Sequence, residues 1–257
     1  MNGAKISALA ASVLCILPVR PASLDARSSP NPVATGTIVE RAAAAYSTSV
    51  QGVIGMQRHF STVISGGPIH HTEVSDSGLL LNDGAFVRIK YYRVVRDGKS
   101  FSTPEIVERE TQTNRDWGLG KVFFKEPYDR RFIADYHFAD VAQCVGCATG
   151  TVAVRFTSLI HDAQHGSGTM WINTSNARVE KLTYVPYALP PHATSGSVTE
   201  TSAQVLDGRW FVTRINEVYT GRAFILSGKG TFTGTIDHFR HFTSLQDGER
   251  ALTAGTL

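Results

Sequence analysis

The sequence predicts a mainly β fold in which an antiparallel sheet curls over its own apolar face. From about Ser49 to Thr243, runs with a period of two residues follow one another with almost no helical period between them. The triplets 82–84 (Asn-Asp-Gly) and 96–98 (Arg-Asp-Gly) are tight-turn sequences of the kind that join hairpin strands. About ten or eleven strands without crossover helices favour antiparallel pairing, in a barrel, a half-barrel or a sandwich.

An export signal precedes this predicted sheet. Lys5 supplies a basic start, and residues 6–17 form an apolar segment. This segment is shorter than the roughly 20 apolar residues that span a bilayer, although an N-terminal membrane anchor is the alternative. Ala22 and Ala26 are small residues that offer cleavage sites. We therefore expect residues 1–22 to be a signal peptide and the mature protein to be periplasmic or secreted.

Length and charge fit a single exported domain. Removing 22 of the 257 residues leaves about 235, within the range of one all-β domain. We expect a flexible leader at 23–36, one β-rich domain at 37–245 and a flexible tail at 246–257. Loss of Lys5 and Arg20 with the signal lowers the formal net charge of +3 by two. The near-neutral chain has no basic stripe, which argues against nucleic acid as a partner.

Two cysteines remain after removal of the signal. Cys144 and Cys147 lie three residues apart on either side of Val-Gly. In an oxidising compartment this spacing favours a structural disulfide across a tight turn. A redox-active pair normally opens a helix, whereas strands are expected on both sides here. A zinc site would need a second pair of ligands nearby, so we expect no metal.

Two segments depart from the period of two. Thr37 to Tyr46 has apolar residues at helical spacing and predicts one early helix. Pro104 to Arg115 is rich in charge and predicts a short helix or a loop that crosses one edge of the sheet. The strands are expected at 53–64, 70–81, 85–95, 121–125, 130–138, 152–157, 169–173, 178–186, 197–205, 209–219, 223–229 and 231–242.

No catalytic signature stands out. His161 and His165 have the spacing of metal ligands on a helix, but a turn is expected between them. There is no Gly-x-Ser-x-Gly sequence and no phosphate-binding glycine loop. We therefore expect a protein that is not an enzyme and holds no cofactor. A buried cluster of His161, Asp162 and a serine or metal would instead indicate a hydrolase.

Two short stretches resemble a known family. Residues 168–179, which begin Gly-Thr-Met-Trp-Ile-Asn, resemble the hairpin that begins Gly-Thr-hydrophobic-Trp-Ile-Asp in the LolA/LolB-like periplasmic lipoprotein-carrier superfamily. Residues 207–212 (Asp-Gly-Arg-Trp-Phe-Val) resemble its later Gly-x-Trp strand. The resemblance implies a half-barrel with a helix in its mouth. It also implies a hydrophobic hollow that binds lipid or lipoprotein acyl chains, or senses envelope components, without chemistry. Asn173 stands where the family has aspartate, and the insertion at 104–115 and the cysteine turn are not family features.

These observations predict a monomeric domain that binds an apolar ligand, a lipid or an acylated protein, on the concave side of its sheet. Each acyl methylene buried there would contribute about 0.8 kcal/mol. The early helix and the segment 104–115 would restrict access of water. The alternative is an envelope protein-interaction or sensing module with a filled core. The candidate lining residues are Val87, Ile89, Tyr91, Phe123, Phe132, Phe156, Met170, Trp210 and Phe224.

Overall fold

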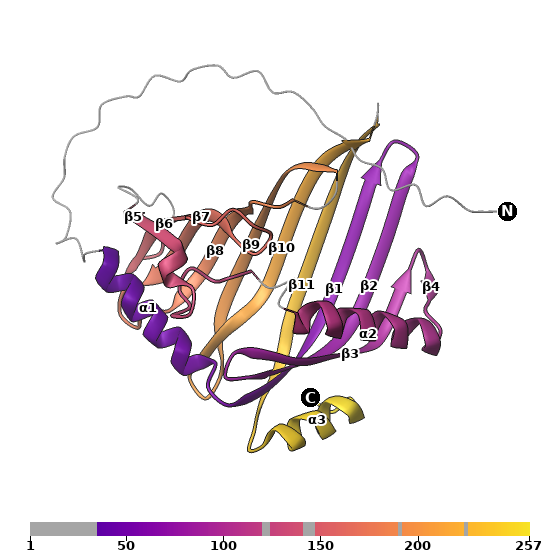
Figure 1. Ribbon diagram of the computed structural model, residues 1–257, viewed down its shortest axis with the longest axis horizontal. Helices are drawn as coiled ribbons and strands as arrows, with labels where there is room; N and C mark the ends of the chain where they lie inside the picture. The colour runs from indigo at the N-terminus through magenta and orange to yellow at the C-terminus, as the bar shows by residue number, and fades with distance from the viewer. Residues whose placement is uncertain (1–34, 120–123, 141–146, 190–191, 224–225) are drawn as a thin grey trace.

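The computed structural model describes residues 35–119, 124–140, 147–189, 192–223 and 226–257. These residues form one antiparallel sheet in the order β4-β3-β2-β1-β11-β10-β9-β8-β7-β6-β5, which curls without closing (Figure 1). The predicted curled antiparallel sheet is confirmed. Its strands are β1 (Val53–Gly66), β2 (Ile69–Asn82), β3 (Ala85–Arg96), β4 (Lys99–Ser100), β5 (Tyr136–Asp140), β6 (Thr151–Ser158), β7 (Gly166–Asn173), β8 (Val179–Pro186), β9 (Ala193–Leu206), β10 (Arg209–Ala223) and β11 (Leu226–Phe242).

Aspartate-glycine pairs fix three of the hairpins. In the pairs 83–84, 97–98 and 207–208, both residues have a positive φ, between 43° and 78°. Such turns match the right-handed twist of the strands that they join, and glycine adopts the left-handed backbone without steric cost. The two turns predicted from 82–84 and 96–98 are therefore confirmed, and the third joins β9 to β10.

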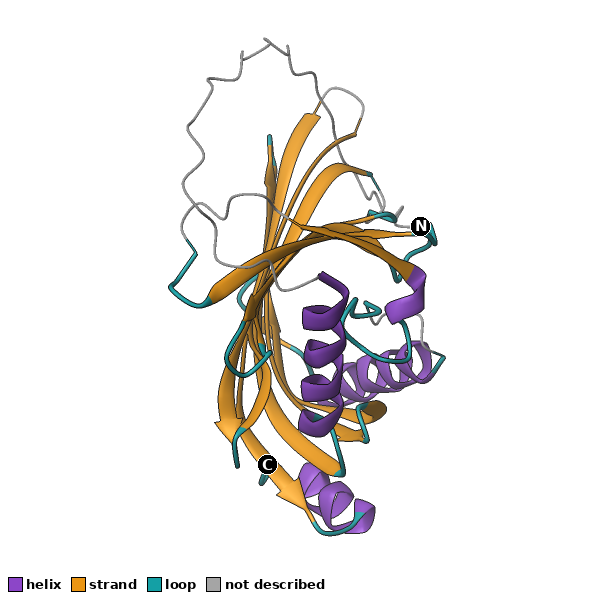
Figure 2. Cartoon of the chain, turned by 90° about the vertical axis from the view of Figure 1, so that its left-hand side faces the viewer, coloured by secondary structure: helices purple, strands orange, loops and turns teal. Residues whose placement is uncertain are grey.

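Helix α1 (Thr35–Ser49) fills the concave face of one half of the sheet (Figure 2). Its buried face carries Ile38, Val39 and Ala42, which pack against residues from β6 to β9. The predicted helix at 37–46 is confirmed and extends at both ends. The core that it completes includes Phe156 and Met170, both fully buried.

Helix α2 (Thr103–Gly118) lies on the same side of the sheet and runs along β3 (Figures 1 and 2). Ser102 and Glu105 form a capping box at its start, and Pro104 occupies the first turn. The side chain of Asn114 bonds both the N–H and the C=O of Ile89, at 2.8 and 2.9 Å. The predicted insertion is thus a helix, and it satisfies the backbone at this edge of the sheet.

Helix α3 (Leu245–Ala254) packs on the opposite face of the sheet, where the sequence predicts a flexible tail. Its start is capped by the Ser244 hydroxyl, which accepts from the N–H of Asp247 at 3.1 Å. Leu252 is fully buried against Leu80. Gly248 weakens the helical signal in the sequence, but a β-carbon there would meet Leu80 at 2.8 Å, so the glycine permits this close packing.

The expected strand at 130–138 is wrong over most of its length. Residues 133–135 form a short 3-10 helix, and β5 begins only at Tyr136. The carboxylate of Asp129 accepts from the backbone N–H of Arg131 at 2.9 Å, and this local bond turns the chain. The expected break at residue 230 is also wrong, since β11 runs through it.

Several expectations fall on residues outside the described ranges. Residues 1–34 belong to this part, so the signal peptide, the leader and the division into domains stay predictions. The strand expected at 121–125 lies mostly outside as well, as does Cys144. The disulfide between Cys144 and Cys147 therefore stays a prediction. None of the described helices combines the length and apolar character that crossing a bilayer requires.

Candidate site: two adjoining cavities on the concave face

The period of two places a row of side chains from each long strand on the concave face. On β1 this row contains Ile54, Met56, Arg58 and Phe60, and its neighbours on β11, β10 and β9 point the same way. In the half that α1 covers, these side chains make a packed core. Beside the C-terminal end of α1, and in the half along α2, they border two cavities.

The larger space, here called the central cavity, has a volume of about 480 Å³. Pockets of roughly 300–1,000 Å³ are typical of small-molecule sites. Strands β1 to β3 and β8 to β11, helix α2 and the segment 124–126 contribute its walls. The lining residues are Arg58, Phe60, Thr62, Glu73, Ser75, Leu79, Tyr91, Arg109, Trp117, Phe124, Glu126, Tyr184, Glu200, Val212, Ile215, Glu217, Phe232 and Ile236.

The smaller space, here called the helix cavity, has a volume of about 190 Å³ and lies beside α1. Glu126, Val212 and Ile236 line both cavities, so the two adjoin. Aromatic pairs stiffen the wall of the central cavity. The rings of Phe124 and Tyr184 stack with centroids 3.8 Å apart, and those of Phe60 and Phe232 lie 4.8 Å apart.

Arg58 is a buried cation in the wall of the central cavity. Only 8% of the residue is exposed. Its guanidinium carbon lies 4.3 Å from the ring centre of Phe60 and 4.7 Å from that of Trp117. Burial lowers the pKa of Arg58 to about 10, so the group is still charged at neutral pH. Within the described ranges, no carboxylate pairs with it.

Two buried carboxyl groups, of Glu126 and Glu200, lie at another part of the wall. They are within hydrogen-bonding reach of each other, and Oε2 of each lacks any further partner among the described residues. The hydroxyl of Tyr184 donates to Oε1 of Glu200 at 3.3 Å. Burial raises the pKa of Glu200 to about 7, and burial together with the charge of Glu200 raises that of Glu126 well above its usual value. A proton shared between the two carboxyls would satisfy both unpartnered oxygens.

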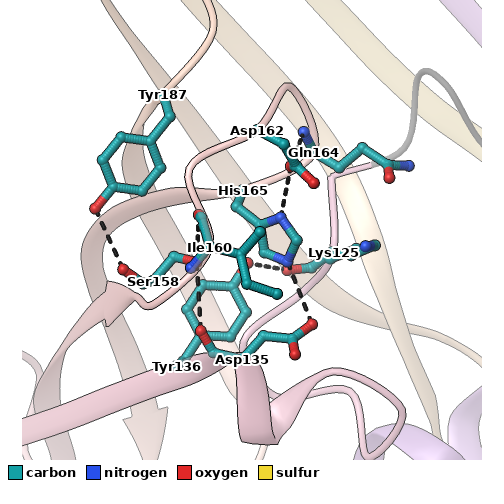
Figure 3. A network of polar contacts seen from close by, with 9 residues as sticks. All are labelled: Lys125, Asp135, Tyr136, Ser158, Ile160, Asp162, Gln164, His165 and Tyr187. Atoms are coloured by element: carbon teal, nitrogen blue, oxygen red, sulfur yellow. Dashed lines mark hydrogen bonds and ion pairs between the residues drawn. The ribbon is translucent and has the colours of Figure 1, made fainter.

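A buried histidine network holds the segment that carries Glu126 (Figure 3). The ring of His165, with no exposed surface, bonds Asp162 through Nδ1 at 2.6 Å and Asp135 through Nε2 at 3.3 Å. The backbone N–H of Lys125 donates to the carbonyl of Gln164 at 2.9 Å. Burial opposes ionisation of Asp162, but the bonds from His165 and from the N–H of Gln164 lower its pKa overall.

This network does not have the geometry of a hydrolase. Both ring nitrogens of His165 face carboxylates, so neither can take a proton from a serine. The hydroxyl of Ser158 instead bonds the carbonyl of Ile160 at 2.8 Å. His161 stacks on Tyr187, with ring centres 4.2 Å apart. In the described part of the chain, no group of three histidine, cysteine or acidic residues has a metal-binding arrangement.

The structure brings few of the predicted lining residues together. Tyr91 lines the central cavity and Trp210 the helix cavity. Ile89, Phe156 and Met170 are fully buried. Phe132 packs at the edge of the α1 core rather than in a strand, and Phe123 and Phe224 lie outside the described residues.

Val87 lies on the other face of the sheet, because β3 contains a bulge. Leu80 pairs with Arg88 and Leu81 with Phe86, which leaves Val87 as an extra residue. Val87 therefore packs with the α3 cluster, and Phe86 contacts Trp117 on the concave side. One bulge thus reverses the face expected from strict alternation.

The charged wall residues Arg58, Glu126, Glu200 and Glu217 are absent from the residues expected from the sequence. Three of them could have been predicted from the sequence, because each lies two positions from an apolar residue of the same strand and therefore on the same face. Arg58 follows Met56 and precedes Phe60, while Glu200 follows Val198. A charge in register with an inward-facing row points into the fold. Glu126 lies in an irregular segment, where no such period exists.

Comparison with known proteins returns structures but no sequence family. No family model and no curated protein matches the chain. Among solved structures, it is similar to a LolA superfamily protein from Nitrosomonas europaea, with 12% identity, a TM-score of 0.40 and coverage of 88% of this chain and 100% of the other. A putative outer membrane lipoprotein-sorting protein domain from Vibrio parahaemolyticus has 12% identity and a TM-score of 0.38, over 84% and 97% of the two chains.

A DUF1329 family protein from Desulfovibrio piger has 11% identity and a TM-score of 0.41, over 86% of this chain and 98% of its own. The structures returned thus include the superfamily that the sequence resembles. All three TM-scores are below 0.5, so the likeness to these structures carries no information about function.

Proposed function

We propose that this protein is an exported, non-enzymatic binding protein that holds a lipid or an acyl chain in the central cavity. The observation that supports this function is a space of about 480 Å³ on the concave face, bordered by aromatic and aliphatic side chains together with charged ones. A protein interior normally fills such a space with its own side chains. A ligand with an apolar body would bury the exposed parts of Phe60, Phe232 and Ile215, at about 0.8 kcal/mol for each methylene.

The helices and the segment 124–126 would retain such a ligand. Trp117 of α2 and Phe124 both contribute to the wall, so the ligand would lie between the sheet and these two segments. The proposed cycle is therefore uptake and release of an intact molecule, with no covalent step.

Native mass spectrometry of the protein purified from the periplasm tests this proposal, followed by organic extraction of the sample. We expect a co-purifying phospholipid or acylated species, or saturable uptake of a fluorescent fatty acid by the stripped protein. A protein that carries no lipid and takes up no fatty acid would contradict the proposal. Phe232→Trp, which narrows the cavity, should weaken uptake, and Val107→Trp on the exposed surface of α2 serves as its control.

A second candidate function is a protein-interaction module of the cell envelope. Leu159, Ile160, Val185 and Tyr187 are exposed apolar residues around the β6–β7 connection and the end of β8. Exposed apolar groups of this kind are typical of contact surfaces. A lipid-free protein in the extraction experiment, together with capture of a single envelope protein that Leu159→Ser and Val185→Ser abolish, would favour this function instead.

A further inference from the structure

We propose that the central cavity recognises an acidic group of its ligand, a carboxylate or a phosphate, through an ion pair with Arg58. This inference rests on the proposed function and names the chemistry of the ligand's polar end. The apolar body would then extend from Arg58 across the sheet, along Phe60, Phe232 and Ile215.

Arg58 differs from the other arginines around the cavity because none of the described carboxylates forms an ion pair with it. Arg109 pairs with Glu73 at 2.5 Å, and Arg96 pairs with the same carboxylate at 2.6 Å. Arg88 pairs with Glu110 at 3.3 Å and Arg93 with Asp76 at 3.2 Å. Arg58 is the more buried group, with 8% of its surface exposed, yet in the described part of the chain its contacts are with aromatic rings.

A buried charge without a partner is costly, so its retention needs a reason. The guanidinium carbon lies over the rings of Phe60 and Trp117, and both rings stabilise the cation. The five N–H donors of a guanidinium lie in its plane, and a carboxylate or phosphate can accept two of them at once. The two rings therefore orient the group and leave its donors to an acceptor that the ligand brings into the cavity.

The carboxyls of Glu126 and Glu200 do not serve as the acceptor for the N–H donors of Arg58. Arg58 lies on β1 and Glu200 on β9, with β11 and β10 between them, so three strand spacings, about 14 Å along the sheet, separate them. Glu73 lines the same cavity, but its carboxylate is already bonded to Arg96 and Arg109. The far wall is also unsuited to an anion, because Glu126, Glu200 and Glu217 lie there. An acidic ligand is thus directed with its charge toward β1 and its chain toward β9.

The experiment compares three probes that share one apolar chain. Binding of hexadecanoate, hexadecyl phosphate and methyl hexadecanoate is measured by displacement of a fluorescent fatty acid ester, with the unsubstituted protein, Arg58→Met, Arg58→Lys and the control Arg93→Met. Arg93 lies on β3, is mostly exposed and already has a carboxylate partner. The comparison of the two acids shows whether the site prefers a fatty-acid carboxylate or a phosphate headgroup.

We expect the unsubstituted protein to bind at least one acid about tenfold or more tightly than the neutral ester, as charge-assisted hydrogen bonds allow. Arg58→Met should remove this preference and leave ester binding within about twofold. Arg58→Lys should retain part of it, and Arg93→Met all of it. Binding of the ester by Arg58→Met also shows that the variant is folded.

Two failures are distinguishable. If the unsubstituted protein binds the acids and the ester equally, or if Arg58→Met keeps the preference for acids, the inference is overturned and the lipid-binding function stands. If none of the three probes binds to the unsubstituted protein, both the proposed function and the inference are overturned.

Discussion

The concave face is covered differently in the two halves of the sheet. Around β5 to β8 the concave face is covered by α1, and the space between them is filled by Phe156, Met170, Leu182 and their neighbours. Around β1 to β3, α2 lies along the edge strand instead and buries no residue completely. The concave face there stays hollow and contains charges. A helix placed on a curled sheet makes a core, whereas one placed at its edge leaves a cavity.

The two halves are therefore expected to contribute differently to folding stability and to ligand binding. The filled half provides stability, because large apolar side chains are packed on all sides. The hollow half gives up part of this packing, and its wall contains Arg58 and the two glutamates in positions that lower stability. Ligand binding and folding stability should therefore respond to substitutions in different halves.

The largest expected effect is the loss of a packed ring in the filled half. Phe156→Ala should lower the free energy of unfolding by about 3–5 kcal/mol, because it leaves an enclosed void. Phe232→Ala in the hollow half should cost about 1 kcal/mol, mainly the contact with Phe60. Urea unfolding of both variants checks the difference. Equal losses would show that the central cavity is as tightly packed as the core.

The next effect concerns the buried carboxyls of the hollow half. Below pH 4.5 Glu200 is protonated in both the folded and the unfolded protein, so its contribution to stability is fully present. As the pH rises toward about 7, the unfolded protein ionises first and stability is lost. The rise of the pKa from 4.5 to about 7 corresponds to roughly 3 kcal/mol.

Glu200→Gln should therefore be more stable than the unsubstituted protein at pH 8 and show a flatter dependence on pH between 5 and 8. Glu249→Gln, at an exposed position of α3, is the control. Unfolding in urea at several pH values measures this. An unchanged slope for Glu200→Gln would mean that the group ionises freely in the folded protein.

A smaller effect is expected where the filled half supports the cavity wall. His165→Ala should cost about 2 kcal/mol, because two carboxylates lose their partner. His161→Ala, which removes a surface ring stack, should cost less than about 0.5 kcal/mol. Hydrogen exchange of Lys125 should accelerate only in His165→Ala, since its N–H bonds the adjacent turn. Unchanged exchange at Lys125 would show that the His165 network does not hold the segment 124–126 of the cavity wall in place.

The smallest effect is at the edge of the hollow half. Asn114→Ala removes the bonds to both backbone groups of Ile89 and should cost about 1 kcal/mol. The matched control is Gln112→Ala, on the exposed side of the same helix. Faster hydrogen exchange of Ile89 in Asn114→Ala, together with a loss of global stability of about 1 kcal/mol, is the expected result. If Ile89 stays protected, another group must cover this edge.

Features that are determined by neighbouring residues in the chain could be predicted from the sequence, and features that depend on tertiary contacts could not. Turns at Asp83 and Asp97 follow from two adjacent residues, and the early helix follows from one apolar face. The bulge at Val87 and the chain reversal at Asp129 depend on single hydrogen-bonding positions that no period reveals. Glu126 and Glu200 are far apart in the chain, and only the tertiary fold makes them neighbours.

The bonds from Asn114 to Ile89 also bear on how copies of this protein can meet. A second chain that approached β3 as an additional strand would find the amide and carbonyl of Ile89 already bonded, and Glu110 accepts the next available N–H, that of Tyr91. Growth into an open fibre by strand addition needs both margins of every sheet. Because one margin is bonded to a helix of its own chain, such growth would stop at a single pair, and this protects a sheet with such long strands from ordered aggregation.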